Sequence, residues 1–239
     1  MIIGGLQRLT LIDYPGKLAA TVFLAGCNFR CPWCYSSELV LPEKIKNQPK
    51  ISENEFFEFL DGKKGLLEGV VICGGEPTLN KDLMDFIGKI KEMGFSVKLD
   101  TNGTNPELLK ELLDKKMIDY VAMDIKAPKD KYQKLTGKKI NLADIEKSVA
   151  LLLSLPLNSR IQKLADYEFR TTLVPNLLQK EDIISISRWI SGAERYYVQN
   201  FRPEKNIDKE YEGIKPYPDD YVLDIVKAIS PFFGECQMR

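Results

Sequence analysis

Three cysteines lie close together near the start of the chain. Cys27, Cys31 and Cys34 form a C-x3-C-x2-C pattern, and no fourth cysteine follows nearby. A cubane iron–sulfur cluster is normally held by four cysteine thiolates. Three thiolates in one tight loop would bind three irons and leave the fourth open to a ligand that is not protein. An open iron is a place for chemistry, so the triplet predicts a catalytic iron–sulfur site.

Other interpretations of the triplet stay open. A structural zinc site prefers C-x2-C pairs and four ligands, often including histidine. Because the chain has no histidine, the fourth zinc ligand would be the distant Cys73 or Cys236. The thiols could also be buried without a metal, since free cysteine packs like a small hydrophobic residue. A disulfide framework is disfavoured by the low cysteine content and the lack of a signal-peptide pattern.

The composition narrows the classes of function. Lysine plus arginine and aspartate plus glutamate both number 34, so the net charge is zero and no nucleic-acid partner is indicated. No apolar run approaches the ~20 residues of a membrane span. We therefore expect a soluble, cytoplasmic protein without a membrane partner. Because the chain has no histidine, Ser-His-Asp and Cys-His catalysis are excluded. Any catalysis must therefore use carboxylates, Lys, Cys, Tyr or a cofactor.

Short apolar runs alternate with amphipathic stretches along the chain. The predicted strands, rich in β-branched and aromatic residues, are Ala20–Ala25, Gly69–Cys73, Ser96–Asp100, Tyr120–Ile125, Glu168–Val174 and Arg195–Asn200. The predicted helices are Lys81–Met93, Pro106–Lys116, Asn141–Leu155, Glu181–Trp189 and Pro218–Ile229. This alternation predicts an α/β fold with a parallel sheet. Six βα units are too few for a closed eight-fold barrel, so we expect an open-sided, partial (β/α)6 barrel.

The chain length fits a single domain covering residues 1–239. Residues 1–18 are expected to form a short hairpin-like extension and residues 19–239 the partial barrel. The extension contains Asp13-Tyr14-Pro15-Gly16, with Pro and Gly suited to the centre of a type II turn. Residues Lys44–Lys64 are the least regular part of the chain and are expected to be a surface insertion.

Polar and glycine-rich segments follow the predicted strands. In parallel α/β folds, ligands bind at the carboxyl ends of the strands. The candidate residues at these ends, besides the cysteine loop with Trp33, are Gly74, Gly75, Glu76, Asp100, Thr101, Asp124, Lys126, Arg170, Gln199 and Asn200. Their shared placement predicts one binding site on one rim of the sheet.

Each candidate also has a simpler structural interpretation. The Gly74-Gly75 pair could be a tight turn, although two glycines let a ligand approach the backbone closely. Asp124 and Lys126 lie on the same face of their strand and could form a salt bridge. Asp100 could cap a turn, Arg170 could be a buried ion-pair partner, and Trp33 could be a packing residue. Cys73 is expected to face the barrel core and Cys236 to lie in the tail.

Taken together, these residues resemble the radical S-adenosylmethionine (SAM) superfamily. The cysteine triplet with Trp33 as its aromatic residue matches the superfamily motif, and Gly74-Gly75-Glu76-Pro77 matches its glycine-rich motif. More narrowly, Leu11–Lys17, Val22–Leu24 and Gly26–Pro32 are similar to the activating proteins of anaerobic ribonucleoside-triphosphate reductase. One departure is Tyr35, because relatives often have histidine directly after the third cysteine.

The resemblance implies an activity and its cofactors. It implies a [4Fe-4S] cluster on Cys27, Cys31 and Cys34, with SAM bound to the open iron. Reductive cleavage of SAM would give a 5′-deoxyadenosyl radical that takes hydrogen from a glycine of a partner glycyl radical enzyme. The electron would come from a flavodoxin- or ferredoxin-type donor. The cofactor would do the difficult chemistry while the protein binds and orients it.

The resemblance also implies roles for the rim residues. Gly74, Gly75 and Glu76 would hold the SAM ammonium, and Arg170 is a candidate for its carboxylate. The positions around SAM and a monovalent cation match Asp100, Thr101, Asp124 and Lys126. Ribose or adenine contacts are expected from Gln199 and Asn200. Two rival functions stay open: a radical SAM enzyme acting on a small molecule such as a modified-base precursor, and a non-catalytic metal-binding protein.

Overall fold

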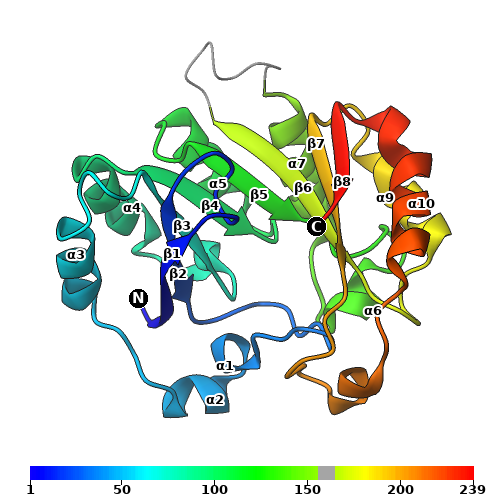
Figure 1. Cartoon of the computed structure of the whole chain (residues 1–239), viewed down its shortest axis with the longest axis horizontal. Coiled ribbons are helices and arrows are strands. Elements are labelled where there is room, and N and C mark those ends of the chain that lie inside the picture. Colours follow the sequence, from blue (N-terminus) through cyan, green and yellow to red (C-terminus); the bar gives the residue numbers. More distant parts are fainter. Residues whose placement is uncertain (156–164) are drawn as a thin grey trace.

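The computed structural model describes residues 1–155 and 165–239. In these ranges the strands form one sheet in the order β1-β2-β3-β4-β5-β6-β7-β8 (Figure 1). β1 pairs antiparallel with β2, and every later pair of neighbours is parallel. The strands are β1 (Ile3–Thr10), β2 (Ala19–Leu24), β3 (Gly69–Gly74), β4 (Ser96–Thr101), β5 (Tyr120–Asp124), β6 (Asp166–Leu173), β7 (Arg195–Asn200) and β8 (Glu235–Met238).

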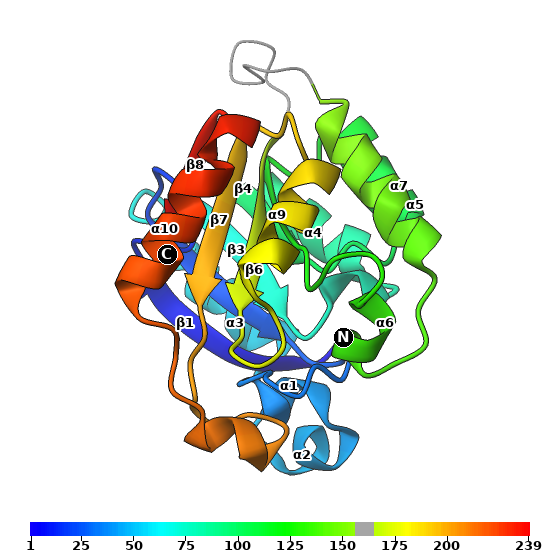
Figure 2. The ribbon, with the colours of Figure 1, turned by 90° about the vertical axis from the view of Figure 1, so that its right-hand side faces the viewer.

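Helices cover the outer face of the curved sheet (Figure 2). The helices that connect successive parallel strands are α3 (Glu53–Asp61), α4 (Leu83–Glu92), α5 (Pro106–Asp114), α7 (Leu142–Leu153), α9 (Lys180–Trp189) and α10 (Asp219–Ile229). The shorter helical segments are α1 (Ser37–Val40), α2 (Pro42–Asn47), α6 (Tyr132–Thr136), η1 (Pro77–Leu79), η2 (Lys209–Gly213) and η3 (Ser230–Phe232). Of these, α1, α2, α6 and η2 lie at the carboxyl ends of the strands (Figure 1).

The two faces of the sheet differ in chemistry. On β4, Val97 and Leu99 belong to the main hydrophobic core, which the sheet shares with the helices. Lys98 and Asp100 alternate with them and therefore point to the inner face of the sheet. Burial of the apolar face against the helices fixes the sheet, and polar side chains are presented on the inner face.

The predicted α/β partial barrel is confirmed. The six predicted strands correspond to β2 through β7, and the five predicted helices to α4, α5, α7, α9 and α10. The predicted turn is also present: Lys17 N donates to Tyr14 O at 3.2 Å, and Gly16 has a φ of 73°. The turn closes the antiparallel β1–β2 hairpin. The division of the chain into an extension and a barrel within one domain stays a prediction.

Two details of the sequence analysis are wrong. Residues Lys44–Lys64 are not an irregular insertion, because they contain α3, which lies between β2 and β3 and buries Phe56 and Leu60 completely. The exposed residues of α3 are mostly acidic, so the composition of the segment resembles that of a surface loop. Cys236 is not in a tail but in β8, opposite Tyr196 of β7. β8 has four residues, too few to give a clear alternating pattern.

In the described ranges, no helix has both the length and the apolar character needed to span a membrane.

Candidate functional site

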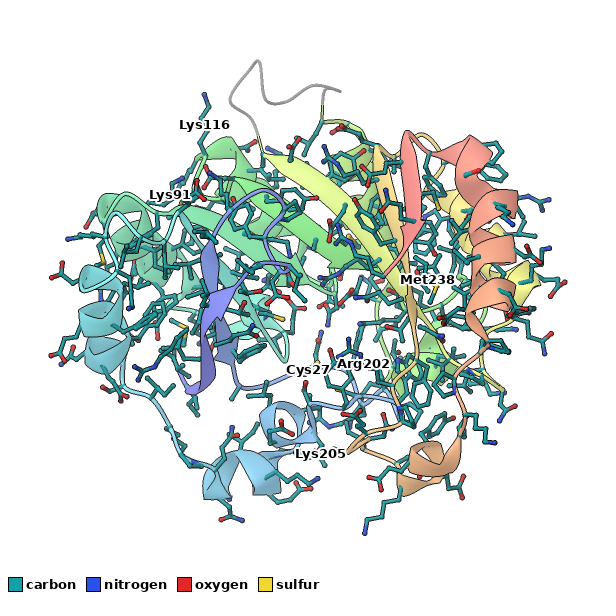
Figure 3. The ribbon with its side chains drawn as sticks, viewed as in Figure 1. Cys27, Lys91, Lys116, Arg202, Lys205 and Met238 are labelled. Carbon is teal, nitrogen blue, oxygen red and sulfur yellow. The ribbon has the colours of Figure 1, made fainter. Side chains whose placement is uncertain are left out.

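The cysteine loop follows β2 and lies at the carboxyl ends of the strands, where Figure 3 shows Cys27. Backbone hydrogen bonds brace it from three directions. Glu76 N donates to Gly26 O at 2.7 Å, and Arg30 N donates to Thr136 O, at the end of α6, at 2.8 Å. From the third direction, Ile207 N donates to Cys34 O at 2.9 Å. Backbone hydrogen bonds from three separate segments thus help to hold the loop in shape.

The three thiols lie in a largely buried setting. Burial raises the pKa of Cys27 to about 11 and that of Cys31 to about 12, and it also raises the pKa of Cys34. The ammonium of Lys126 acts in the opposite direction on all three thiols, because a nearby cation favours the thiolate. Metal binding requires deprotonated cysteines, so Lys126 is placed to favour the ligand form.

The Gly74-Gly75 pair lies directly against the start of the cysteine loop. A Cβ on Gly75 would lie 2.0 Å from Gly26 O, and one on Gly74 would lie 2.1 Å from Leu24 O. Gly74 also has a φ of 130°, in a region that favours glycine. The two glycines therefore allow two segments of backbone to meet here, and a larger residue at either position would push them apart.

The carboxylate of Glu76 ties neighbouring strand ends together. Its Oε1 accepts hydrogen bonds from Thr78 N, Thr78 Oγ1 and Thr101 Oγ1, and its Oε2 accepts from Asn102 N at 2.6 Å. The side chain is buried, and burial raises its pKa against the opposing effect of these donors. Because the carboxylate is engaged within the chain, any contact of Glu76 with a ligand ammonium falls to its backbone.

A chain of ion pairs crosses the inner face beside the cysteine loop. Arg170 donates from Nη1 to Asp100 Oδ2 and from Nε to Asp124 Oδ1, both at 3.0 Å. Lys126 Nζ donates to Asp124 Oδ2 at 3.1 Å, and Lys98 Nζ donates to Asp100 Oδ1. The five side chains alternate in sign, with three cations and two carboxylates. The ion pairs that the sequence left open for Arg170, and for Asp124 with Lys126, are therefore present.

These ion pairs change the pKa values of both carboxyl groups. Burial by itself would raise the pKa of Asp124, but Arg170 and Lys126 lower it to about 2. Burial would likewise raise the pKa of Asp100, whereas Arg170 and Lys98 lower it below the ordinary value. Both aspartates are therefore carboxylates at neutral pH.

The remaining predicted site residues lie in different places. Trp33 is buried in the main core. Gln199 lies on β7 next to Asn200, whose amide is engaged away from the inner face, donating to Tyr217 O at 2.8 Å. Tyr35 is 57% exposed at the end of the cysteine loop. The structure thus brings together the cysteine loop, the two glycines, Asp100, Asp124, Lys126 and Arg170, but does not turn the Asn200 side chain toward them.

The sequence analysis missed Lys98 as a member of this site. The same period-2 argument that placed Asp124 and Lys126 on one face also places Lys98 with Asp100. The sequence signal that could have identified Lys98 is its position between Val97 and Leu99 in a predicted apolar strand.

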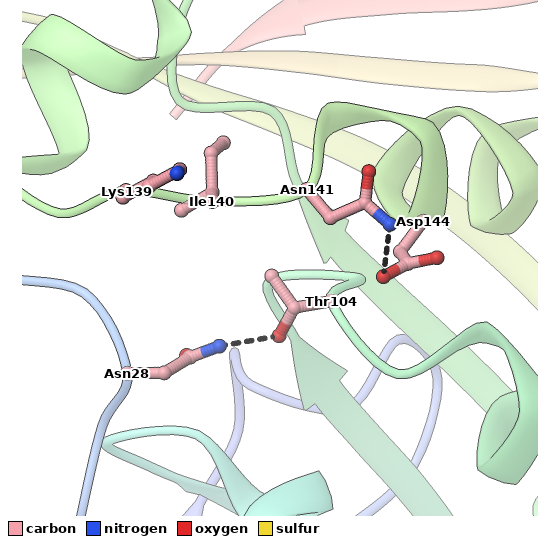
Figure 4. A pocket seen from close by; sticks show the side chains of 6 residues that line it. All are labelled: Asn28, Thr104, Lys139, Ile140, Asn141 and Asp144. Atoms are coloured by element: carbon pink, nitrogen blue, oxygen red, sulfur yellow. Dashed lines mark hydrogen bonds between the residues drawn. The ribbon is translucent and has the colours of Figure 1, made fainter.

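The sequence analysis also missed an amide cluster around Asn28. Asn28 Nδ2 donates to Thr104 Oγ1 at 2.8 Å, and Asn102 Nδ2 donates to Asn28 Oδ1 at 2.9 Å. These bonds join the cysteine loop to the end of β4. The bond between Asn28 and Thr104 lies beside a pocket of about 190 Å³ (Figure 4). The pocket is lined by Asn28, Thr104, Lys139, Ile140, Asn141 and Asp144.

Comparison with known proteins places this geometry in a family. The family model described as the Radical SAM superfamily matches residues 21–165, which include the cysteine loop, the glycine pair and the carboxylates of Glu76, Asp100 and Asp124. The chain belongs to the radical SAM superfamily. It is accordingly a radical SAM enzyme, of a family whose members use SAM and a [4Fe-4S] cluster.

Individual relatives extend the comparison. A Methanocaldococcus jannaschii protein, provisionally named a glycyl-radical enzyme activating enzyme, is 36% identical over 100% of this chain and 95% of its own length. A 7-carboxy-7-deazaguanine synthase from Thermococcus kodakarensis is 30% identical over 46% of this chain and 50% of its own length. Among solved structures, Streptococcus suis SuiB bound to S-adenosylmethionine is similar in fold, with a TM-score of 0.61, 16% identity, and 92% of this chain and 51% of that chain covered.

The residues present fit the cofactors of the superfamily. The donor set is three cysteines in one braced loop, and iron–sulfur clusters are held by cysteine thiolates. Within residues 1–155 and 165–239, no three His, Cys, Asp or Glu side chains converge to hold a single metal ion. A cubane cluster does not need its thiolates to converge on one point, because each thiolate binds a different iron. Beside the loop, the two glycines let the backbone after β3 pack directly against Leu24 and Gly26, where a side chain would not fit.

Proposed function

We propose that this chain is a glycyl-radical enzyme activating enzyme. The observation that supports this most strongly is the similarity to the M. jannaschii protein of that provisional name, which runs through the whole of this chain. The similarity to the 7-carboxy-7-deazaguanine synthase extends over less than half of it. The higher identity over the whole chain therefore favours the glycyl-radical enzyme activating relative as the guide to substrate.

The inner face of the sheet gives a second reason for a protein substrate. Below the rim, Glu168 is completely buried and accepts hydrogen bonds from Tyr120 Oη at 2.8 Å and from Arg239 Nη1 at 3.0 Å. Lys98 is also buried at this level. The chain's own side chains thus occupy the depth of the barrel, whereas small-molecule sites are usually enclosed cavities. A substrate that meets the enzyme at the rim suits a loop of a partner protein.

When bound, the cofactors would supply the chemistry: one electron would cleave the sulfonium C–S bond of SAM to give methionine and a 5′-deoxyadenosyl radical, which would remove hydrogen from a glycine. Cys27, Cys31 and Cys34 would hold the cluster. The backbone carbonyls of Gly74 and Gly75 would accept hydrogen bonds from the SAM ammonium. We assign Arg170 to the SAM carboxylate, because its guanidinium is already oriented by Asp100 and Asp124. Gln199 is assigned to ribose or adenine.

The N-terminal similarity suggests a particular partner. Residues 11–17, 22–24 and 26–32 resemble activating proteins of anaerobic ribonucleoside-triphosphate reductase, so this reductase is the proposed protein substrate. Each cleavage of SAM consumes one electron, for which we propose a flavodoxin- or ferredoxin-type donor.

The test is anaerobic activation of the reductase. Reconstituted protein, a chemical reductant, SAM and purified anaerobic ribonucleoside-triphosphate reductase are mixed, and 5′-deoxyadenosine and the electron paramagnetic resonance signal of a glycyl radical are measured. We expect both, and neither with the Cys31→Ala variant. Formation of 5′-deoxyadenosine without a protein radical, stimulated instead by a modified-base precursor, would favour a small-molecule substrate. Bound iron without any 5′-deoxyadenosine would favour a non-catalytic metal-binding protein.

A further inference from the structure

A buried lysine lies directly below the rim where SAM is proposed to bind. Lys98 precedes Asp100 by two residues on β4, and only 1% of its side chain is exposed. Its ammonium donates to Asp100 Oδ1, while Asp100 Oδ2 accepts from Arg170 Nη1 at 3.0 Å. Each oxygen of this carboxylate therefore faces a cation that belongs to the chain.

The other oxygens expected around a monovalent cation are engaged as well. Thr101 Oγ1 donates its proton to Glu76 Oε1 at 2.7 Å. Asp124 Oδ1 accepts from Arg170 Nε at 3.0 Å, and its Oδ2 accepts from Lys126 at 3.1 Å. Alkali and alkaline-earth cations bind through oxygen ligands. Here the oxygens of Asp100 and Asp124 already contact ammonium and guanidinium groups, and the Thr101 hydroxyl is hydrogen-bonded within the chain.

An added cation would also meet like charge. The network of Lys98, Asp100, Arg170, Asp124 and Lys126 contains three cations and two carboxylates, so it carries one net positive charge. The residues present therefore do not fit the monovalent cation that the family resemblance suggests.

We propose that the Lys98 ammonium takes the place of this cation. It neutralises Asp100 and holds the carboxylate in position, so that SAM binding and cleavage do not depend on potassium or sodium. Lys98 acts through Asp100 and is a positioning residue. The proposal rests on one part of the proposed function, namely that SAM binds at this rim. The Tyr120 ring, whose centroid is 5.8 Å from Lys98 Nζ, adds a further contact to the buried ammonium.

The first test needs no variant. SAM cleavage by the reconstituted wild-type enzyme with a chemical reductant is measured in potassium, sodium and tetramethylammonium chloride at equal ionic strength. We expect rates within about twofold of one another, a difference of less than about 0.5 kcal/mol in the barrier. A rate at least about tenfold higher in potassium or sodium than in tetramethylammonium would overturn the proposal.

Lys98→Ala tests the assignment to this side chain. The variant leaves Asp100 without one cation and opens space beside it, so we expect slow cleavage in tetramethylammonium and recovery of at least about fivefold in potassium. Lys98→Met fills the space with an apolar side chain and should not recover. Equal loss of activity by Lys98→Ala in all three salts would mean a purely structural role and would overturn the proposal. The control is Lys91→Ala, which removes an ion pair with Asp119 at the other end of the sheet (Figure 3).

A second readout does not depend on catalysis. The melting temperature of the metal-free protein is measured in the same three salts. We expect no salt dependence for the wild type and a higher melting temperature in potassium for Lys98→Ala. A melting temperature of the wild type that rises specifically with potassium or sodium would contradict the proposal. Since this measurement uses neither SAM nor a partner, it stays informative if the proposed function fails.

Discussion

The carboxylate of Glu76 lies 2.6 Å from the backbone nitrogen of Asn102 and joins the carboxyl ends of β3 and β4. Its other oxygen accepts from Thr78 and Thr101. The glycine pair before Glu76 contacts the cysteine loop, and Thr101 directly follows Asp100 of the ion-pair network. One buried carboxylate thus fixes the three parts of the proposed site relative to one another.

Glu76→Gln should destabilise the protein. Glutamine keeps the size of the side chain but directs an amide donor toward N–H and O–H donors, leaving buried groups unsatisfied. We expect the free energy of unfolding to fall by about 2–4 kcal/mol, measured by urea denaturation. Glu92→Gln, at an exposed position at the end of α4, is the matched control. Equal stability of the two variants would refute the role of Glu76 as a link.

Gly75→Ala should displace the cysteine loop. The new methyl group would lie 2.0 Å from Gly26 O, so the backbone must move. We expect a loss of about 1–3 kcal/mol in stability and weaker SAM binding, measured by urea denaturation and by equilibrium dialysis of the reconstituted protein. Gly88→Ala is the control, because its methyl group meets only Met117 Cε at 3.9 Å in α4. In a helix this control should be neutral or stabilising by up to about 1 kcal/mol.

The five cysteines should separate into two classes. Alanine at Cys27, Cys31 or Cys34 should abolish the cluster, because each thiolate binds a different iron. Alanine at Cys73 or Cys236 should leave it intact. The measurement is the iron and sulfide content after anaerobic reconstitution. Loss of the cluster from a Cys236 variant would revive the four-thiolate interpretations.

Asp124 should make stability depend on pH in the acid range. Its pKa is lowered from 3.8 to about 2 in the folded protein, so the carboxylate stabilises the fold above about pH 4. This contribution, about 2 kcal/mol, is lost as the pH falls through about 2. The advantage of the wild type over Asp124→Asn in urea denaturation should therefore shrink from about pH 6 to about pH 2. Asp85→Asn, at an exposed position on α4, is the control, and a constant difference would contradict the assignment.

Ile207→Pro should loosen the cysteine loop. Ile207 N donates to Cys34 O at 2.9 Å, and proline removes this donor. We expect faster amide hydrogen exchange in residues 27–36 and slower cluster assembly, followed by mass spectrometry and by visible absorption. Ile207→Ala keeps the backbone donor and should behave like the wild type. Similar exchange in both variants would mean that the bracing from residue 207 is dispensable.

The sequence by itself determined the chemistry of the site and the class of fold. The cysteine spacing is local, so three thiols in one loop follow from the order of residues alone. The alternation of apolar strands and amphipathic helices predicts a parallel sheet, and parallel strands bring their carboxyl ends to one rim. Asp124 and Lys126 share a face because side chains alternate along a strand. These features depend on neighbouring residues or on a short repeat.

Only the tertiary structure decided which side chains face one another across strands. The side chains of Arg170, Asp100 and Asp124 come from three strands, and their pairing depends on strand register and on burial. The same holds for Glu76, whose partners Thr101 and Asn102, at and just after the end of β4, lie 25 and 26 residues further along the chain. α3 was missed because its four apolar residues lie within one short stretch of a nine-residue helix whose other residues are polar. β8 was missed because its four residues are stabilised by pairing with β7. These pairings and short elements depend on contacts between residues far apart in the chain. The local sequence around each of them has too weak a pattern to predict them.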